Sequence, residues 1–342
     1  MKRKGETTTY VDKLKNMETT FVRKMRNDPT EYTPAYDGNT ISRGTPYIID
    51  IPEAEEWRKF LYKKSENKFL KKPFNNAHQV VRGDNQVSCS FLGFAAGAYL
   101  KNKDYVKQIT KYDWNKSLEI DENNEPKWME VWESMKKIGR NITKNKEGGM
   151  PNIAMMLDVL KEQRSEDFNI PIEYIPIRAT NDNYYNSEIV TVKNYEKALD
   201  KIEDYLKEMI KKHDVVVLNM DSHTRVFFGY FEYEIEDEKK IRKKLLAYDS
   251  YTKTQKKLRA IKNGDKLKEK DKKFKFMSKE EVCDDDDIVD VTIGGISLVD
   301  LRWAASKVKE LVYFKEENTN RRKKRRKRVY NWLHNFKYKL KF

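Results

Sequence analysis

Three residue types suited to nucleophilic chemistry follow one another along this chain: Cys89, then His223, then Asp249. A cysteine nucleophile needs a base that takes its proton, and the base needs an acceptor that fixes its tautomer. His223 follows Cys89 by 134 residues (223 − 89), and Asp249 follows His223 by 26 (249 − 223). The order and spacing therefore predict a site at which Cys89 attacks an acyl carbon.

The sequence around Cys89 places its thiol where a helix is expected to begin. After Cys89, apolar and small residues run almost unbroken to Leu100, which predicts a helix buried on most sides. Ser88 or Asn85 is expected to cap it. A thiol at the start of a helix meets the positive end of the helix dipole, which lowers its pKa. The alternative is a small buried side chain under a core helix, without a chemical role.

The predicted positions of His223 and Asp249 depend on three strand-like runs separated by polar residues. VVVLNMDSH (215–223), RVFFGYFEYE (225–234) and LLAYDSY (245–251) indicate an antiparallel meander, with the charged run EDEKKIRKK as an exposed hairpin tip. His223 would end one strand and Asp249 would end a neighbouring strand. The two side chains are therefore expected within hydrogen-bonding distance.

The other three histidines fit a catalytic base less well. His213 ends a predicted helix and His334 lies in a basic tail, so both are expected at the surface. His78 precedes Cys89 by a short interval and is the weaker alternative base. His223 is therefore the favoured base.

Further helices and strands must carry these residues. Amphipathic patterns predict helices over 52–64, 128–138, 153–163 and 195–212. NIPIEYIPI (169–177) predicts an edge strand or a strand that is only partly paired, because its two prolines cannot donate to a sheet. Residues 289–314 predict a strand, a Gly-Gly turn and a helix. Trp114, Trp128 and Trp132 are expected in the core or on a docking surface.

Taken in order, these motifs resemble a papain-like cysteine peptidase, in the compact form of the bacteriocin-processing double-glycine peptidases. The resemblance covers about residues 75–255 and includes the segments "HTRVFFGY" and "AYDSY". It implies Cys89 as nucleophile, His223 as general base and Asp249 as the group that orients the imidazole. It also implies a glutamine, Gln86 or Gln79, which with the Cys89 backbone N–H would stabilise the oxyanion.

The resemblance implies an α+β fold in which an N-terminal Cys-bearing helix packs on an antiparallel sheet. We expect an N-terminal arm over 1–50 and a papain-like catalytic domain over 51–315. Insertions are expected at about 101–147, which is helical, and at about 252–287. A basic aromatic tail would occupy 316–342.

The strands around His223 and Asp249 are also similar to those of the adenoviral and ubiquitin-like-protein proteases. Those enzymes place their cysteine after the aspartate, where this chain offers Cys283. The acidic run Asp284–Asp287 beside it would raise the pKa of that thiol, so Cys89 is favoured as the nucleophile. Four adjacent carboxylates cannot all face one ion, so we predict a solvated loop and no metal site or cofactor.

Composition bears on partners and compartment. The chain of 342 residues has a formal net charge of +15 and a mean hydropathy of −0.92, which favours a polyanionic partner. Two cysteines far apart fit a reducing compartment, and the basic start MKRKGETTTY lacks the apolar core of a signal peptide. We therefore expect an intracellular protein, in the nucleus or a virion, without a membrane segment.

The C-terminal tail combines cations with aromatic side chains, a composition typical of nucleic-acid contact or nuclear import. The candidate nucleic-acid-binding residues are Arg321, Arg322, Lys323, Lys324, Arg325, Arg326, Lys327, Arg328 and Trp332.

The predicted function is that of a cysteine peptidase cleaving a polypeptide, with a viral polyprotein, a maturing capsid or a ubiquitin-like conjugate as substrate and virion proteins as partners. The alternative is an inactive papain-fold protein that binds nucleic acid or a virion component. A transglutaminase-like acyltransferase shares the order Cys, His, Asp and stays open as well.

Overall fold

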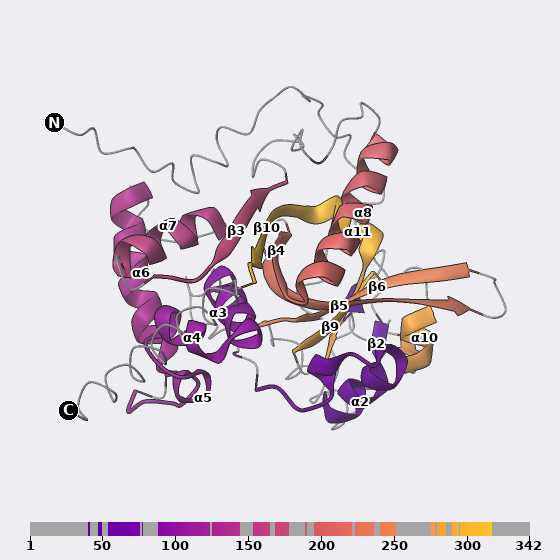
Figure 1. The fold of residues 1–342 in the computed structure, drawn as a ribbon. Helices are drawn as coiled ribbons and strands as arrows, with labels where there is room; N and C mark the ends of the chain where they lie inside the picture. The colour runs from indigo at the N-terminus through magenta and orange to yellow at the C-terminus, as the bar shows by residue number, and fades with distance from the viewer. Residues whose placement is uncertain are drawn as a thin grey trace, which may run out of the picture.

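The computed structural model describes residues 40–41, 47–49, 54–75, 77, 88–123, 125–143, 153–164, 168–177, 189, 195–220, 223–235, 240–250, 275–277, 279–284, 289–293 and 295–316. Within these ranges, helices pack against a curled antiparallel sheet (Figure 1). The expected α+β class is therefore confirmed.

One sheet of eight strands organises the described part of the chain, in the order β1-β8-β9-β6-β5-β4-β10-β3. Every neighbouring pair in it is antiparallel. Its strands are β1 (Thr40–Ile41), β3 (Ile172–Pro176), β4 (Val216–Met220), β5 (His223–Ile235), β6 (Lys240–Tyr248), β8 (Asp290–Ile293), β9 (Ile296–Asp300) and β10 (Val308–Phe314). A second, parallel pair joins β2 (Tyr47–Ile49) to β7 (Lys275–Met277).

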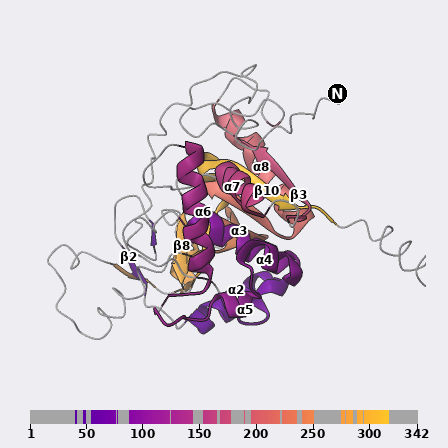
Figure 2. The same cartoon turned by 90° about the vertical axis from the view of Figure 1, so that its left-hand side faces the viewer.

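Helices cover both faces of the large sheet, as Figures 1 and 2 show. One face carries a core built with residues of α2 (Ala54–Ser65), α3 (Cys89–Lys101), α4 (Lys103–Thr110), α6 (Trp128–Thr143) and α7 (Ile153–Arg164). The other face packs against α8 (Tyr195–His213) and α11 (Leu301–Lys307). The remaining described helices are α5 (Trp114–Ser117), α10 (Lys279–Asp284) and the 3₁₀ turn η2 (Lys68–Leu70).

Helix α3 lies directly against the sheet because small residues face the strands. A methyl group added at Gly97 would come within 2.8 Å of Val217 Cγ2 on β4, and one added at Gly93 within 3.1 Å of Thr224 Cγ2 on β5. Both distances leave little room for a larger side chain. The close approach fixes the start of α3, and with it Cys89, beside the first residues of β5.

A buried carboxyl ties α7 to the sheet. Glu310 on β10 accepts hydrogen bonds from the backbone N–H groups of Ile153 (3.0 Å) and Ala154 (2.9 Å), from the Tyr174 hydroxyl (3.0 Å) and from the Asn219 amide. Its side chain thus satisfies two N–H groups in the first turn of α7, which have no partner within the helix. Burial raises the pKa of Glu310, and these hydrogen bonds offset part of that rise.

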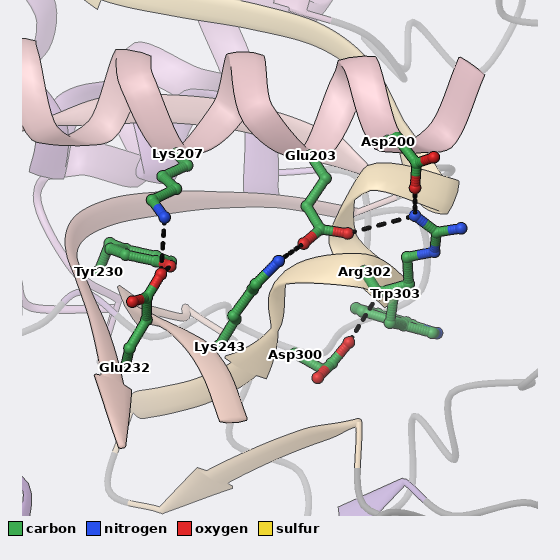
Figure 3. Close-up of polar contacts among 9 residues, drawn as sticks. All are labelled: Asp200, Glu203, Lys207, Tyr230, Glu232, Lys243, Asp300, Arg302 and Trp303. Carbon is green, nitrogen blue, oxygen red and sulfur yellow. Dashed lines mark hydrogen bonds and ion pairs between the residues drawn. The ribbon is translucent and has the colours of Figure 1, made fainter. Parts of the chain in front are cut away.

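A network of charged side chains fixes α8 and α11 on the opposite face (Figure 3). Glu203 of α8 accepts from Lys243 Nζ on β6 (2.7 Å) and from Arg302 Nη1 on α11 (3.3 Å). Arg302 also pairs with Asp200, and Lys207 pairs with Glu232 on β5 (2.6 Å). Most of these side chains are partly exposed, so each pair contributes at most about 1 kcal/mol.

Several expected elements are confirmed. The helices predicted over 52–64, 128–138, 153–163 and 195–212 correspond to α2, α6, α7 and α8, and the meander corresponds to β4, β5 and β6. The proline-containing segment 169–177 forms β3, which is an edge strand as predicted. The three tryptophans expected in the core or on a docking surface are 0–2% exposed and belong to the core.

Two local predictions are wrong. The charged run after β5 is not simply a solvent-exposed tip, because β6 begins at Lys240, and Arg242 and Lys244 in it are buried. The region 289–314 contains a hairpin of β8 and β9 around the glycine pair, then α11, and finally β10. The strand β10 was not predicted, although it lies between β4 and β3.

The expected domain limits stay predictions. The stretch 1–50 contributes β1 and β2, and the expected insertion at 252–287 contributes β7 and α10. The helices of 101–147 pack into the same core as α3. Across the described ranges, no helix combines the length and apolar character that a membrane span requires.

Candidate thiol site

Cys89 is the first residue of α3, as predicted, and its side chain is buried with a relative exposure of 2%. Ser88 occupies the N-cap position, but its side chain makes no capping hydrogen bond. The thiol therefore sits at the positive end of a 13-residue helix, where a thiolate is favoured over a thiol.

His223 and Asp249 are held together beside this helix start. His223 opens β5 rather than ending the preceding strand, and it pairs in register with Met220 of β4. Asp249 directly follows β6, the other neighbour of β5. The Nε2 atom of His223 lies 2.7 Å from Oδ1 of Asp249, and both side chains are almost fully buried. The predicted pair is thus formed by the end of one strand and the beginning of its neighbour.

A hydrogen bond joins the Cys89 thiol to His223. Because Asp249 engages Nε2, Nδ1 is the ring nitrogen that can serve the sulfur. Burial alone would raise the pKa of the Cys89 thiol, but the hydrogen bond to His223, the charge of the imidazolium and the backbone N–H of Thr224 lower it below its ordinary value of 9.0. The environment of the sulfur favours the thiolate.

The pKa of the His223 imidazole is shifted in the opposite direction to that of the thiol. Burial alone would lower the pKa of His223, but the charge of Asp249, the hydrogen bond to Asp249 and the hydrogen bond to Cys89 raise it to about 10. At neutral pH the arrangement therefore favours a thiolate–imidazolium pair, in which the sulfur is the nucleophile and the imidazolium is the acid.

A hydroxyl pair fixes the start of α3 against β5. Ser90 Oγ lies 3.1 Å from Thr224 Oγ1, in a buried contact between the residues that follow Cys89 and His223. Thr224 therefore contacts α3 directly, while the neighbouring His223 reaches the thiol at the start of that helix. The contact links the backbone carrying the thiol to the backbone carrying the imidazole.

Sequence reasoning missed two charged residues next to Asp249. Arg225 Nε lies 2.6 Å from Asp249 Oδ2, and Arg225 Nη2 lies 2.6 Å from Oδ2 of Asp290 on β8. The i, i+2 spacing of His223 and Arg225 in a strand was a usable signal for the arginine. Asp290 gave no such signal, because its contact depends on a strand distant in sequence.

Other predicted residues lie outside the described ranges. These are His78, Gln79, Asn85, Gln86, Asp285–Asp287, and the tail with Arg321–Arg328, Trp332 and His334. Their predicted roles in capping, base catalysis, oxyanion stabilisation and nucleic-acid binding stay predictions. Cys283 lies in α10, is 1% exposed and interacts electrostatically with Lys244. It is therefore placed on a different element from the His223–Asp249 pair.

Among the residues that the structure describes, no three His, Cys, Asp or Glu side chains are grouped so that they could hold a metal ion.

No family model and no curated protein matches this chain.

Proposed function

We propose that the chain is a cysteine peptidase of papain-like architecture, with Cys89, His223 and Asp249 as its catalytic residues. The observation that carries the proposal is the continuous contact from the thiol at the start of α3 through His223 to the Asp249 carboxylate. A buried cysteine with only a packing role needs neither a basic partner nor a carboxylate behind that partner.

In the proposed reaction, the Cys89 thiolate attacks the carbonyl carbon of an amide bond. His223 then donates its proton to the leaving nitrogen, the C–N bond breaks, and an acyl thioester on Cys89 remains. The neutral imidazole next takes a proton from water, whose oxygen attacks the thioester carbon. The C–S bond breaks, the acid is released, and the thiolate–imidazolium pair is restored. Asp249 keeps Nε2 occupied, so that Nδ1 faces the sulfur throughout.

The tetrahedral intermediate needs hydrogen-bond donors for its oxyanion. The backbone N–H of Cys89, in the first turn of α3, is one proposed donor. Gln86 or Gln79 is the other, as the resemblance implies. A polypeptide is the proposed substrate, with a viral polyprotein or a ubiquitin-like conjugate as the favoured source, inside a cell or a virion.

The test is hydrolysis of a library of internally quenched peptides by the full chain. Cys89→Ala is expected to abolish hydrolysis, whereas the matched variant Cys283→Ala retains it, because Cys283 lies on another element. Hydrolysis that survives Cys89→Ala, or that Cys283→Ala abolishes in a folded protein, would contradict the assignment. Addition of a primary amine distinguishes transfer of the acyl group from its hydrolysis.

The low exposure of Cys89 and His223, 2% and 6%, favours one second candidate: a catalytically inactive protein of the same fold that binds nucleic acid. The net charge of +15 and the residues Arg321–Arg328 support it. Binding to a nucleic-acid duplex that weakens steeply with salt, combined with a thiol inert to iodoacetamide in the folded chain, would favour this candidate over the peptidase.

A further inference from the structure

Arg225 lies between two buried carboxylates and contacts the one that orients His223. Asp249 uses Oδ1 for His223 and Oδ2 for Arg225, so both of its oxygens are engaged. Asp290 holds the other end of the guanidinium. Arg225, Asp249 and Asp290 are 6%, 2% and 1% exposed. The carboxylate therefore cannot rotate without breaking a contact to a buried charge.

We propose that Arg225 is a positioning residue of the thiol site and that Asp290 balances its charge, so that Asp249 is held rigidly without weakening the imidazolium. This inference rests on the proposed function, because it assigns two residues to the same site. The three proposed catalytic residues thereby become part of a row of alternating charges, which runs from the thiolate through the imidazolium, the Asp249 carboxylate and the guanidinium to the Asp290 carboxylate.

The balance follows from electrostatics. A guanidinium beside Asp249 is favourable for orientation, because its Nε attracts Oδ2 while His223 holds Oδ1. The same positive charge repels an imidazolium and would lower its pKa if nothing opposed it. Asp290 opposes it. Burial and the charge of Asp249 raise the pKa of Asp290, while the charges of Arg225 and His223 lower it in part. Asp290 and His223 therefore interact electrostatically.

Among the described residues, the titratable and charged groups joined in this row come from four places. They are Cys89 on α3, His223 and Arg225 on β5, Asp249 after β6, and Asp290 on β8. Only one of these positions carries a nucleophile. The other four groups alternate in charge along the row. Loss of the charge at Asp290 is therefore expected to change the pKa of His223.

The experiment uses the full chain with Cys283→Ala, so that Cys89 is its single thiol. The variants are Asp290→Asn, Arg225→Lys and the double variant Arg225→Met with Asp290→Asn. The first readout is the pH dependence of Cys89 alkylation by iodoacetamide, and the second is an NMR titration of the labelled His223 ring. Neither requires a substrate.

In Asp290→Asn both midpoints are expected to fall, by about one pH unit for His223 and by less for the more distant Cys89, because loss of a negative charge disfavours the protonated form of each group. Arg225→Lys keeps the charge, so both midpoints stay near those of the parent. The double variant removes one charge of each sign and brings both midpoints back, yet its turnover falls by about tenfold or more, with KM unchanged, because Asp249 is no longer held. Since the double variant replaces an ion pair by neutral groups, it is the variant best suited to fold.

Folded Asp290→Asn protein with both midpoints equal to those of the parent would overturn the charge balance. A double variant with parental turnover would overturn the positioning role and leave Arg225 as a purely structural ion-pair partner. The two proposals fail separately. Parental protein that hydrolyses no peptide while Asp290→Asn shifts both midpoints refutes the peptidase alone, and Cys89-dependent hydrolysis with unshifted midpoints refutes this inference alone.

Discussion

Asp249 and Glu310 are both buried carboxyl groups on the same sheet, but their partners differ in kind. Glu310 accepts hydrogen bonds from two backbone N–H groups, a hydroxyl and an amide, all of them neutral. Asp249 lies between an imidazole and a guanidinium, and a thiol lies beyond the imidazole. Burial of a carboxyl is thus not by itself a sign of chemistry. The partners decide whether the group supports a helix or polarises a base.

The largest effect is expected from the same chemical change made at both carboxyls. Asp249→Asn should lower turnover by about three to four orders of magnitude, because an amide neither fixes the imidazole tautomer nor stabilises the imidazolium. Glu310→Gln should leave turnover within about twofold, since its hydrogen-bond partners are Ile153, Ala154, Tyr174 and Asn219 and include none of the three proposed catalytic residues. Initial rates of peptide hydrolysis measure both, at a pH where both variants are folded.

Comparable losses of turnover in these two variants would contradict the view that Asp249 is catalytic and Glu310 is structural. A second measurement guards against a loss of fold: circular dichroism and the urea midpoint of each variant are recorded beside its rate.

The next effect concerns stability and is expected at Glu310. Glu310→Ala removes the acceptor of several buried donors, each of which costs about 1–3 kcal/mol when left unpaired. We therefore expect the free energy of unfolding to fall by about 3–5 kcal/mol after partial relaxation. Urea denaturation with an unchanged m-value measures this loss.

Glu310→Gln is the matched control for that prediction, because the amide keeps an acceptor oxygen. It should retain more stability than Glu310→Ala. If the alanine variant is as stable as the parent, the view of Glu310 as the anchor of α7 is wrong.

The third prediction concerns pH and applies to the thiol site alone. The Cys89 pKa is lowered, so alkylation should already be rapid below pH 9.0, the ordinary value for the thiol, and should fall as the thiolate is protonated at lower pH. The pKa of His223 is raised to about 10. Above that pH the imidazole has lost its proton, so turnover should fall while alkylation stays high.

Rates of alkylation and hydrolysis recorded over the same pH range check this difference. Profiles that decline together at high pH would show that the loss of turnover does not come from the missing acid. His223→Gln provides the control, since it should move the alkylation midpoint upward toward the ordinary thiol value.

The sequence predicted those parts of the fold that have long, regular patterns. The apolar face of α8 repeats over 19 residues, and the run after Cys89 is apolar on every side, so both helices were evident. The meander β4–β5–β6 was evident because its strands are consecutive and separated by polar residues. Since consecutive antiparallel strands are adjacent in space, His223 and Asp249 could be expected to meet.

The missed features depend on contacts between distant segments. Asp290 lies on β8 and Arg225 on β5, and the two strands are brought near each other only by the order β8-β9-β6-β5 in the sheet. No local sequence pattern specifies this strand order. The sequence predicts a turn for the charged segment Lys240–Lys244, because buried cations are rare in strands. Lys244 is such a cation, and it pairs with Asp300 at 3.6 Å. The strand β10 follows α11 without a turn residue, so its pattern merged with that of the helix.

The smallest effect tests how the two regions hold their helices. The start of α7 is anchored by a carboxyl, whereas the start of α3 is anchored beside Thr224 by the hydroxyl of Ser90. Ser90→Ala removes one neutral buried hydrogen bond and should lower the free energy of unfolding by about 1 kcal/mol. Turnover should fall only a fewfold, because the glycines of α3 still hold the helix close to β5.

The double variant Ser90→Ala with Thr224→Val separates the hydrogen bond from the packing. Replacing both hydroxyls by apolar groups of similar shape leaves no polar atom unpaired, so part of the stability lost in Ser90→Ala should return. The Thr224 backbone N–H that serves the Cys89 sulfur is unchanged by either substitution. If the double variant recovers stability but not turnover, the hydroxyl pair aligns the thiol with the imidazole. If it recovers neither, the hydroxyl pair is a packing contact whose loss shifts the whole of α3. The Ser90 contact at the start of α3 and the Glu310 contact at the start of α7 would then differ only in how strongly they hold their helices.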